Sequence, residues 1–196
     1  MASNFGKTIQ VSTFGASHGY AIGGIVEGLP CGHTIDIDEL QTFLKRRAPG
    51  QNQLQTQRKE ADIPEFLAGM VDGMLSGSPL AFMIRNTSQH SGDYNNLRDI
   101  PRPSHADFTA RMRYGDKVDM RGGGHFSARL TAPLCVAGGI ALQLLREKGI
   151  EIHGHLKQVG TIQDTPIDMV HPDMKALSEI ATEPIAMVDA DKRSEV

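Results

Sequence analysis

Three consecutive glycines at positions 122–124 limit what this chain can fold into more than any other stretch of its sequence. Glycine has no Cβ, so its backbone adopts positive φ readily and can approach another group closely. An apolar pattern with helical spacing follows, and its members are Leu130, Leu134, Ala137, Ala141, Leu144 and Leu145. Ser127 is placed to cap this helix, and Pro133 falls in its opening part, where proline is best tolerated. The stretch therefore predicts a tight glycine loop that leads straight into a long helix.

A glycine loop at a helix start can bind an anion, because it exposes backbone N–H groups at the positive end of the helix dipole. Arg121 and Arg129 flank this start, and a guanidinium group can hold phosphate or carboxylate oxygens in pairs. Many glycine-rich turns only connect two elements. This stretch by itself leaves anion binding and a plain connection both open.

Basic residues are concentrated in the middle of the chain. Between Lys45 and Arg129 the sequence has thirteen Lys and Arg residues against nine Asp and Glu, although the whole chain has a net charge of −3. Ten of the thirteen are arginines, which recognise planar and tetrahedral anions with a forked geometry that lysine lacks. This bias favours an anionic ligand, and an ordinary solvated surface with ion pairs is the alternative.

The general character of the sequence is that of a soluble globular protein, with 196 residues of which 39% are hydrophobic and 22% charged. No uninterrupted apolar run reaches the ~18–20 residues of a membrane span. The first ten residues lack the features of a signal or transit peptide. Cys31 and Cys135 have neither CxxC nor zinc-ligand spacing. We therefore expect a cytoplasmic protein.

Strand and helix patterns are mixed without a regular βαβ repeat, which favours an α+β fold over a doubly wound sheet. We expect paired strands at 8–14 and 21–26 around the turn that holds Ser17 and His18, and a helix after the Asp36-x-x-Glu39 capping box. The other expected elements are a long loop over 51–62, a hairpin over 66–86, a short helix over 105–113, a strand over 150–162 and a helix over 174–180.

Five motifs follow one another along the chain. They are TFGASHGYAIGGIVEGLPCG (13–32), RRAPG (46–50), TQRKEAD (56–62), RPSHADFT (102–109) and YGDKVDMRGGGHFSARLTAP (114–133). Their order and spacing resemble the amino-terminal half of the chorismate synthase family, over most of residues 5–150. The resemblance implies an α+β layered sandwich, with helices between antiparallel sheets, and a homotetramer.

The resemblance also implies an activity, that of a lyase in the shikimate pathway of aromatic amino acid biosynthesis. Such an enzyme forms chorismate from 5-enolpyruvylshikimate 3-phosphate by a 1,4-elimination of phosphate that requires reduced FMN. The substrate carries a phosphate and two carboxylates, so fixed positive charge is needed around it, and the central arginines provide that charge.

Individual roles follow from the same resemblance. His18 matches the family histidine that protonates the departing phosphate, and His105 matches the one that serves the reduced flavin. Histidine suits both tasks because its ordinary pKa of ~6.5 lets it hold a proton near neutral pH. The other matches are Ser17 and Ser127 as proton-relay serines, Arg47 and Arg129 as substrate-binding arginines, and His125, Phe126 and Ser127 as a flavin-contacting segment.

Three positions depart from the family pattern. Ala16 stands where many members have Glu, and Ala48 and Gln53 stand where arginines are common. The region of Gln53 is associated with NADPH in parts of the family, so these departures argue against nicotinamide binding. The resemblance covers about half of the family's length. We therefore expect one chorismate-synthase-like domain over residues 1–196, truncated relative to the family, with weak FMN binding and little activity by itself.

Other classes of function account for single features. A non-catalytic phospho-ligand-binding domain would explain the glycine loop and the arginines. An RNA-binding module is suggested by Arg121-Gly-Gly, but a pI of about 6.2 and few aromatic residues argue against it. His153 and His155 share a face if their segment is a strand, but they lack further ligands at suitable spacing, so we expect no metal site.

Overall fold

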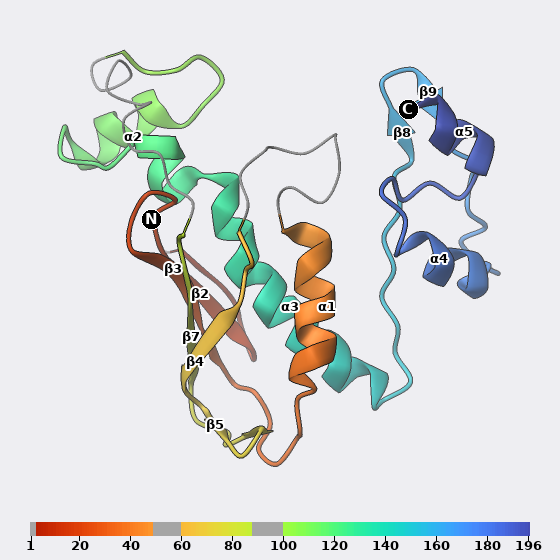
Figure 1. The fold of residues 1–196 in the computed structure, drawn as a ribbon, viewed down its shortest axis with the longest axis horizontal. Coiled ribbons are helices and arrows are strands. Elements are labelled where there is room, and N and C mark those ends of the chain that lie inside the picture. Colours follow the sequence, from red (N-terminus) through yellow and green to blue (C-terminus); the bar gives the residue numbers. More distant parts are fainter. Residues whose placement is uncertain (1–2, 49–59, 88–99) are drawn as a thin grey trace. The chain divides into compact units, whose positions relative to one another are not determined.

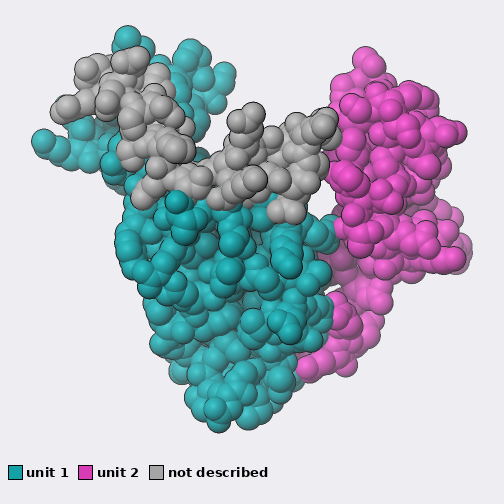
Figure 2. Space-filling view, in the orientation of Figure 1, with its two compact units in different colours: residues 1–144 teal, residues 145–196 magenta. Residues whose placement is uncertain are grey.

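The computed structural model describes residues 3–48, 60–87 and 100–196. The chain divides into two compact units, residues 1–144 and 145–196, coloured teal and magenta in Figure 2. The described parts of all five motifs lie in the first unit. That the whole of 1–196 acts as one domain stays a prediction.

The first unit is built on an antiparallel sheet of five strands (Figure 1). Its order is β1 (Asn4–Gly6), β2 (Gln10–Gly15), β3 (Ala21–Glu27), β7 (Leu80–Arg85) and β4 (Pro64–Ala68). The expected pairing of β2 with β3 is confirmed, with Gly15 opposite Ile22. The turn between these two strands carries Ser17 and His18.

Two glycines in β3 make room for aromatic rings. A Cβ on Gly23 would lie 2.3 Å from Cζ of Phe14, and one on Gly24 would lie 2.8 Å from Cζ of Phe82. Both distances are far below van der Waals contact. Phe82 is fully buried, so these glycines allow the centre of the sheet to pack closely.

The segment expected as one hairpin over 66–86 contains two antiparallel pairings. β4 pairs with β7, with a register shift between Phe66 and Ala68. Within it, β5 (Met70–Val71) and β6 (Met74–Leu75) form a second, shorter hairpin. Asp72 and Gly73 join β5 to β6, both with positive φ, which is the backbone that an Asp-Gly turn favours. The expected antiparallel pairing is confirmed by β4 and β7, but the prediction of a single hairpin was wrong because it passed over the Asp-Gly turn.

Two helices cover the sheet and close the core. α1 (Ile37–Arg47) begins at Asp36, whose side chain accepts a hydrogen bond from the Glu39 N–H at 2.8 Å, so the predicted cap is confirmed. α3 (Thr131–Arg146) runs beside α1 in Figure 1. A Cβ on Gly139 of α3 would lie 2.5 Å from Leu40 Cδ1, so the glycine permits this close approach. The core joins sheet and helices through buried side chains that include Val11, Ile22, Val26, Leu40, Leu44, Phe82, Ile84, Val136 and Ile140.

This arrangement of helices and antiparallel strands confirms the α+β class. Among the described residues, the helices of the first unit accompany one five-stranded sheet and a two-stranded hairpin. The second layer of a sandwich stays a prediction.

The glycine triplet precedes α3 but does not lead straight into it. Gly122, Gly123 and Gly124 have φ of 56°, 89° and 55°, which confirms the expected positive φ. A turn over Arg121–Phe126, kinked at the three glycines, comes first, and a 3₁₀ turn over Ala128–Leu130 then runs directly into α3 at Thr131. The Ser127 side chain accepts from the Arg129 N–H at the start of this helical stretch, so its expected role as an N-cap is confirmed.

One helical segment of the described residues, Arg121–Arg146, is long and apolar enough to cross a membrane, with a mean hydropathy of 1.5. Half of the apolar 18-residue stretch within this segment is buried in the protein. Val136 and Ile140 of α3 belong to the hydrophobic core. The core helix of a soluble protein passes the same test of length and composition. We therefore assign this segment to the core.

The second unit contains β8 (Gln158–Val159), β9 (Ile162–Gln163), α4 (Met174–Ile180) and α5 (Ala190–Glu195). The predicted helix over 174–180 is confirmed, with Asp173 as its cap. The predicted strand over 150–162 was wrong, since only β8 and the first residue of β9 are in strand conformation there. Ile150 and Ile152 of the apolar alternation are exposed, and no described strand pairs with them.

Candidate active site

The glycine triplet lies directly against the turn that carries Ser17 and His18. The Ser17 N–H donates to Gly124 O at 3.1 Å, and Ser17 Oγ donates to Gly122 O at 2.9 Å. A Cβ on Gly122 would lie 2.1 Å from Cε1 and Nδ1 of His18. The missing side chain at position 122 is therefore what allows the imidazole ring to lie here. His18 itself is only 8% exposed.

Ser17 also fixes how the His18 ring can be protonated. Ser17 Oγ lies 3.2 Å from His18 Nδ1. Since the hydroxyl proton is directed to backbone carbonyls, the oxygen is left to accept from Nδ1–H. This assigns the Nδ1 proton to the serine contact.

His105 lies just before α2 (Asp107–Tyr114), and its ring is held by the buried carboxylate of Asp107, the first residue of that helix. Its Nδ1 lies 2.7 Å from Asp107 Oδ1, and Arg102 grips the same carboxylate with Nε and Nη2, each at 2.8 Å. The hydrogen bonds from Arg102 hold the pKa of Asp107 well below its ordinary value. A carboxylate at neutral pH only accepts, so His105 Nδ1 must donate to it, and Nε2 is the nitrogen left for other partners.

The glycine triplet also brings His105 and Ser127 together. A Cβ on Gly123 would lie 3.0 Å from His105 Nε2 and 3.4 Å from the Ser127 Cβ. In the same way, a Cβ on Gly122 would lie 2.1 Å from the His18 ring and 2.9 Å from Ser17 Oγ. All four residues predicted as catalytic thus surround one stretch of bare backbone, although they lie far apart in the sequence.

Arg47 and Arg129 meet at one buried acid, Asp62. Arg47 contacts Asp62 Oδ2 with Nε at 3.0 Å and with Nη2 at 2.9 Å, and Arg129 contacts Asp62 Oδ1 with Nη1. The Asp62 side chain is fully buried, and its backbone has a φ of 50°, which is uncommon for a residue other than glycine. The two predicted substrate arginines are therefore positioned together.

One nitrogen of this cluster, Arg129 Nη2, is buried and has no hydrogen-bond partner among the described residues. Its ion pair with Glu60 Oε2 is long, at 3.8 Å. A buried N–H without an acceptor costs free energy, so an anionic oxygen would be favoured there. The other arginine pairs support the alternative of ordinary ion pairs, since Arg85 binds Glu65, Arg102 binds Asp107 and Arg121 binds Asp119.

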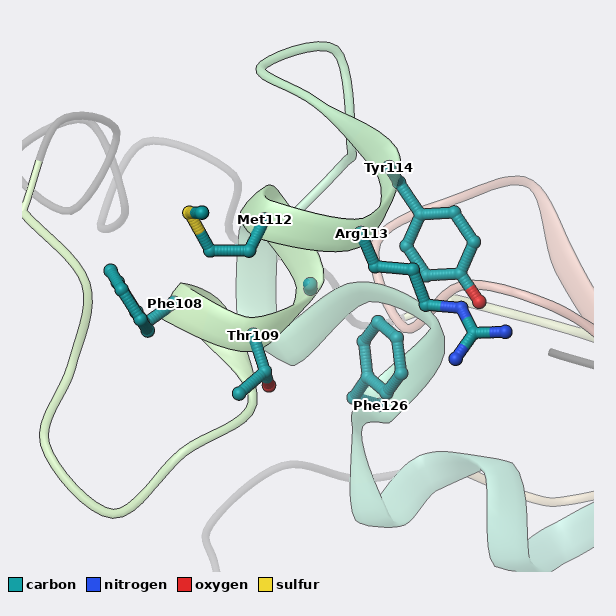
Figure 3. Close-up of a pocket in the computed structure, with 7 residues that line it drawn as sticks. Phe108, Thr109, Met112, Arg113, Tyr114 and Phe126 are labelled. Atoms are coloured by element: carbon teal, nitrogen blue, oxygen red, sulfur yellow. The ribbon is translucent and has the colours of Figure 1, made fainter.

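The segment predicted to contact flavin is divided between two tasks. His125 uses both ring nitrogens within the protein, since Nδ1 lies 2.9 Å from Gly15 O and Nε2 lies 2.6 Å from Ser3 Oγ. It ties the glycine loop to β2. Phe126 instead lines a pocket of about 400 Å³ with residues of α2, and its ring lies 6.3 Å from that of Tyr114 (Figure 3). The other lining residues are Phe108, Thr109, Ala110, Met112 and Arg113.

Comparison with known proteins identifies the family. The sequence profile described as chorismate synthase matches residues 9–195. This chain belongs to the chorismate synthase family. The chorismate synthase of Lancefieldella parvula is 48% identical over 177 residues, which cover 90% of this chain and 46% of that protein. That of Bacteroides fragilis is 43% identical over 196 residues, which cover all of this chain and 53% of that protein.

A crystal structure of chorismate synthase shares the fold. It matches with a TM-score of 0.67 at 24% identity, covering 96% of this chain and 51% of that one. The chain therefore spans about half the length of the chorismate synthases it matches. The roles of individual residues stay predictions, and Gln53 lies outside the described residues.

Sequence reasoning missed several residues that hold this chorismate-synthase-like site together. Glu60, Asp62 and Asp107 lie within the motifs at 56–62 and 102–109, but no role in the site is predicted for them from the sequence. The spacing Arg102-x-x-His105-x-Asp107 could have suggested a shared carboxylate.

His153 and His155 approach different acids, Glu151 and Asp164, and the described residues contain no group of three or more potential metal ligands.

Proposed function

We propose that this chain supplies the histidines and arginines of a chorismate synthase active site, which eliminates phosphate from 5-enolpyruvylshikimate 3-phosphate to give chorismate. The observation that carries the proposal is the meeting of Ser17, His18, His105 and Ser127 at the glycine triplet. An elimination needs an acid beside the leaving group and fixed positive charge beside the substrate. The first unit supplies both in one place.

Arg129 would bind an anionic group of the substrate. Its Nη2 is buried without a hydrogen-bond partner among the described residues, while its other nitrogens contact Asn86 and Asp62. The guanidinium group is thus fixed in orientation before the substrate arrives. A pre-oriented donor loses little side-chain entropy on binding, which strengthens the interaction.

His18 would act as the acid. Ser17 Oγ accepts a hydrogen bond from Nδ1–H, so protonated His18 would deliver its Nε2 proton to the phosphate oxygen as the carbon–oxygen bond breaks. The ring then keeps the neutral form with hydrogen on Nδ1. A positioned acid of this kind contributes about 10²–10⁴ in rate.

The residues present also fit part of a flavin site. His105 has Nδ1 fixed on Asp107 and keeps Nε2 for a ligand, and the ring of Phe126 borders a pocket of a size that small molecules occupy. His105, Phe126 and Ser127 would hold reduced FMN. When bound, reduced FMN supplies the electron density that the elimination requires. His105 would donate or accept a proton at Nε2, and the relay role of Ser127 rests on its place beside that ring.

The proposal extends to the assembly and location that the family implies, a cytoplasmic homotetramer. Light scattering on the purified protein tests the assembly. NADPH is not part of the proposal.

The test is chorismate formation, without oxygen and with chemically reduced FMN, by the full product of the gene that encodes these residues. His18→Gln should lower kcat by about 10²-fold or more, because the leaving phosphate loses its acid. His171→Gln, in the second unit and exposed, is the matched control and should keep the parent rate. Equal rates for His18→Gln and the parent would contradict the proposal.

A non-catalytic domain that binds phosphorylated ligands is the second candidate. The pairing of Arg47 and Arg129 at Asp62 is the observation that favours it. Saturable binding of the substrate without chorismate, at high protein concentration and with fully reduced FMN, would support this second candidate over the first.

A further inference from the structure

Asn86 lies at the junction of the elements that carry His18 and Arg129. It follows the last residue of β7, where Arg85 pairs with Ala21, and its own N–H donates to Tyr20 O at 3.2 Å. The residue is 9% exposed, so its side-chain amide must find partners within the protein.

The amide nitrogen of Asn86 binds both ends of the turn that carries His18. Nδ2 donates to Ala16 O at 3.0 Å and to Gly19 O at 2.9 Å. The same turn is closed by a hydrogen bond from the Gly19 N–H to Ala16 O at 3.0 Å. Both hydrogens of the amide therefore hold the four residues that include Ser17 and His18.

The amide oxygen of Asn86 faces the other way. Oδ1 accepts from Arg129 Nε at 3.1 Å, and both residues are buried. The orientation of the amide is unambiguous, because carbonyl oxygens can only accept and a guanidinium group can only donate. Asn86 thus links the His18 turn to Arg129 through one rigid planar group.

No other side chain replaces these contacts. An aspartate would keep the acceptor for Arg129 but would turn a carboxylate oxygen toward two carbonyl oxygens. A serine is too short and has one donor, and a glutamine adds a methylene group in a buried position. Two donors and one acceptor in this compact geometry require asparagine.

We propose that Asn86 is a positioning residue that sets the place of His18 relative to Arg129, an inference that rests on the proposed function for its catalytic consequence. The acid and the anion-binding group must act on one substrate molecule, so their separation must be fixed. A misplacement of about 1 Å can cost on the order of 10² in rate. Asn86 fixes this separation because its amide group contacts both the His18 turn and Arg129.

The two halves of the link can be tested separately on the purified ¹⁵N-labelled chain. Asn86→Asp keeps the acceptor, so the Arg129 Nε–H resonance should stay observable, while exchange of the Gly19 amide hydrogen should accelerate about tenfold or more. Asn86→Ala should accelerate Gly19 exchange and also lose the Arg129 Nε–H resonance. Unchanged Gly19 exchange in Asn86→Asp would overturn the proposal, even if Asn86→Ala fails to fold.

A matched control exists in the same unit. Gln143 also uses its side-chain amide to bridge backbone groups, donating to Asp36 O and accepting from the Asp36 N–H, each at 2.9 Å. Gln143→Ala should leave both Gly19 exchange and the Arg129 resonance at parent values. If this control changes them as much as Asn86→Ala does, the link is a general effect of stability and the proposal is wrong.

Kinetics distinguish this inference from the proposed function. In the full protein, Asn86→Asp should lower kcat with a smaller change in KM, because the His18 turn moves while Arg129 keeps its contact. Asn86→Ala should lower kcat and raise KM. Full activity in Asn86→Asp would overturn the positioning role. Absence of chorismate from the parent protein would refute the proposed function, and the exchange experiment would still decide the structural link.

Discussion

His105 and Asp107 form a close pair, with Nδ1 of the ring 2.7 Å from Oδ1 of the carboxylate. Arg102 binds both oxygens of that carboxylate, so the acid is itself held in place. The side chain of Asp107 is 3% exposed and that of His105 is 29% exposed. The pair therefore joins a fixed, buried acceptor to a ring whose other nitrogen can still meet a ligand.

The first prediction concerns this pair. Asp107→Asn replaces one of the two acceptor oxygens by an NH₂ group, so the side chain can no longer accept hydrogen bonds from both Arg102 nitrogens and from His105. The His105 ring should then lose its preference for the form with hydrogen on Nδ1. The ¹⁵N shifts of the His105 ring should show hydrogen on Nδ1 in the parent and a mixture of both forms in the variant. Turnover in the full protein should fall about 10-fold to 100-fold, as for other positioning partners of histidine. An unchanged ring spectrum would show that Asp107 does not orient His105.

The second prediction concerns the backbone at the centre of the site. Gly122→Ala would place a Cβ 2.1 Å from the His18 ring at a φ of 56°, so both strain and collision oppose it. The variant should lose about 2–4 kcal/mol of unfolding free energy in urea titration. Gly138→Ala is the control, because no atom lies within 4 Å of its added Cβ and its φ is not positive. Its helical position should gain about 0.5–1 kcal/mol. Equal stability of the two variants would contradict the contact with His18.

Local signals made part of this fold predictable. α1 was predicted from its capping box, which acts within a few residues, and the helix over 174–180 was also predicted from its local sequence. The positive φ of the glycine triplet was expected for the same reason. The prediction of a strand over 150–162 was wrong because alternating apolar residues can define one face of a strand but do not supply a neighbouring strand for it to pair with.

The contacts that build the site could not be predicted from local signals. β7 lies between β3 and β4, an order that no segment encodes by itself. Arg47, Asp62 and Arg129 meet only because this order and the packing of α1 and α3 bring them together. The excess of central arginines therefore suggested free positive charge, whereas most of the described pairs are balanced by acids.

The third prediction concerns Asp164 in the second unit. Burial raises the pKa of this carboxyl, but hydrogen bonds from the N–H groups of Asp189, Val188 and Thr165 outweigh it, and the pKa is lowered. A carboxyl whose pKa is lower in the folded state stabilises it above the unfolded pKa of ~3.9, and this contribution is lost as pH falls below that value. The thermal unfolding temperature of the parent should therefore fall as the pH is lowered below about 4.

Asp164→Asn should weaken this pH dependence and lower stability at pH 6, because the amide replaces one acceptor oxygen with a donor. Asp191→Asn, an exposed residue of the same unit, is the control and should follow the parent curve. A parent-like curve for Asp164→Asn would mean that these hydrogen bonds contribute nothing to the pH dependence.

The last prediction compares the two arginines that share Asp62. Arg129 is 4% exposed and uses Nε on Asn86 and Nη1 on Asp62, whereas Arg47 is 19% exposed and contacts Asp62 and the Thr131 hydroxyl. Lysine keeps the charge but has one ammonium group, which cannot serve both Asn86 and Asp62 from the position of Arg129. Arg129→Lys should therefore lose about 1.5–3 kcal/mol of unfolding free energy, and Arg47→Lys should lose less, because solvent can replace part of its contacts.

The same two variants test anion binding. Titration with the phosphorylated substrate should show a loss of at least tenfold in affinity for Arg129→Lys, since Nη2 is the buried donor left for the ligand. Arg85→Lys is the control, because Arg85 is exposed and pairs with Glu65 on the sheet. If Arg129→Lys binds the substrate as tightly as the parent while losing stability, then Arg129 is only a structural partner of Asp62, and its assignment to the substrate is wrong.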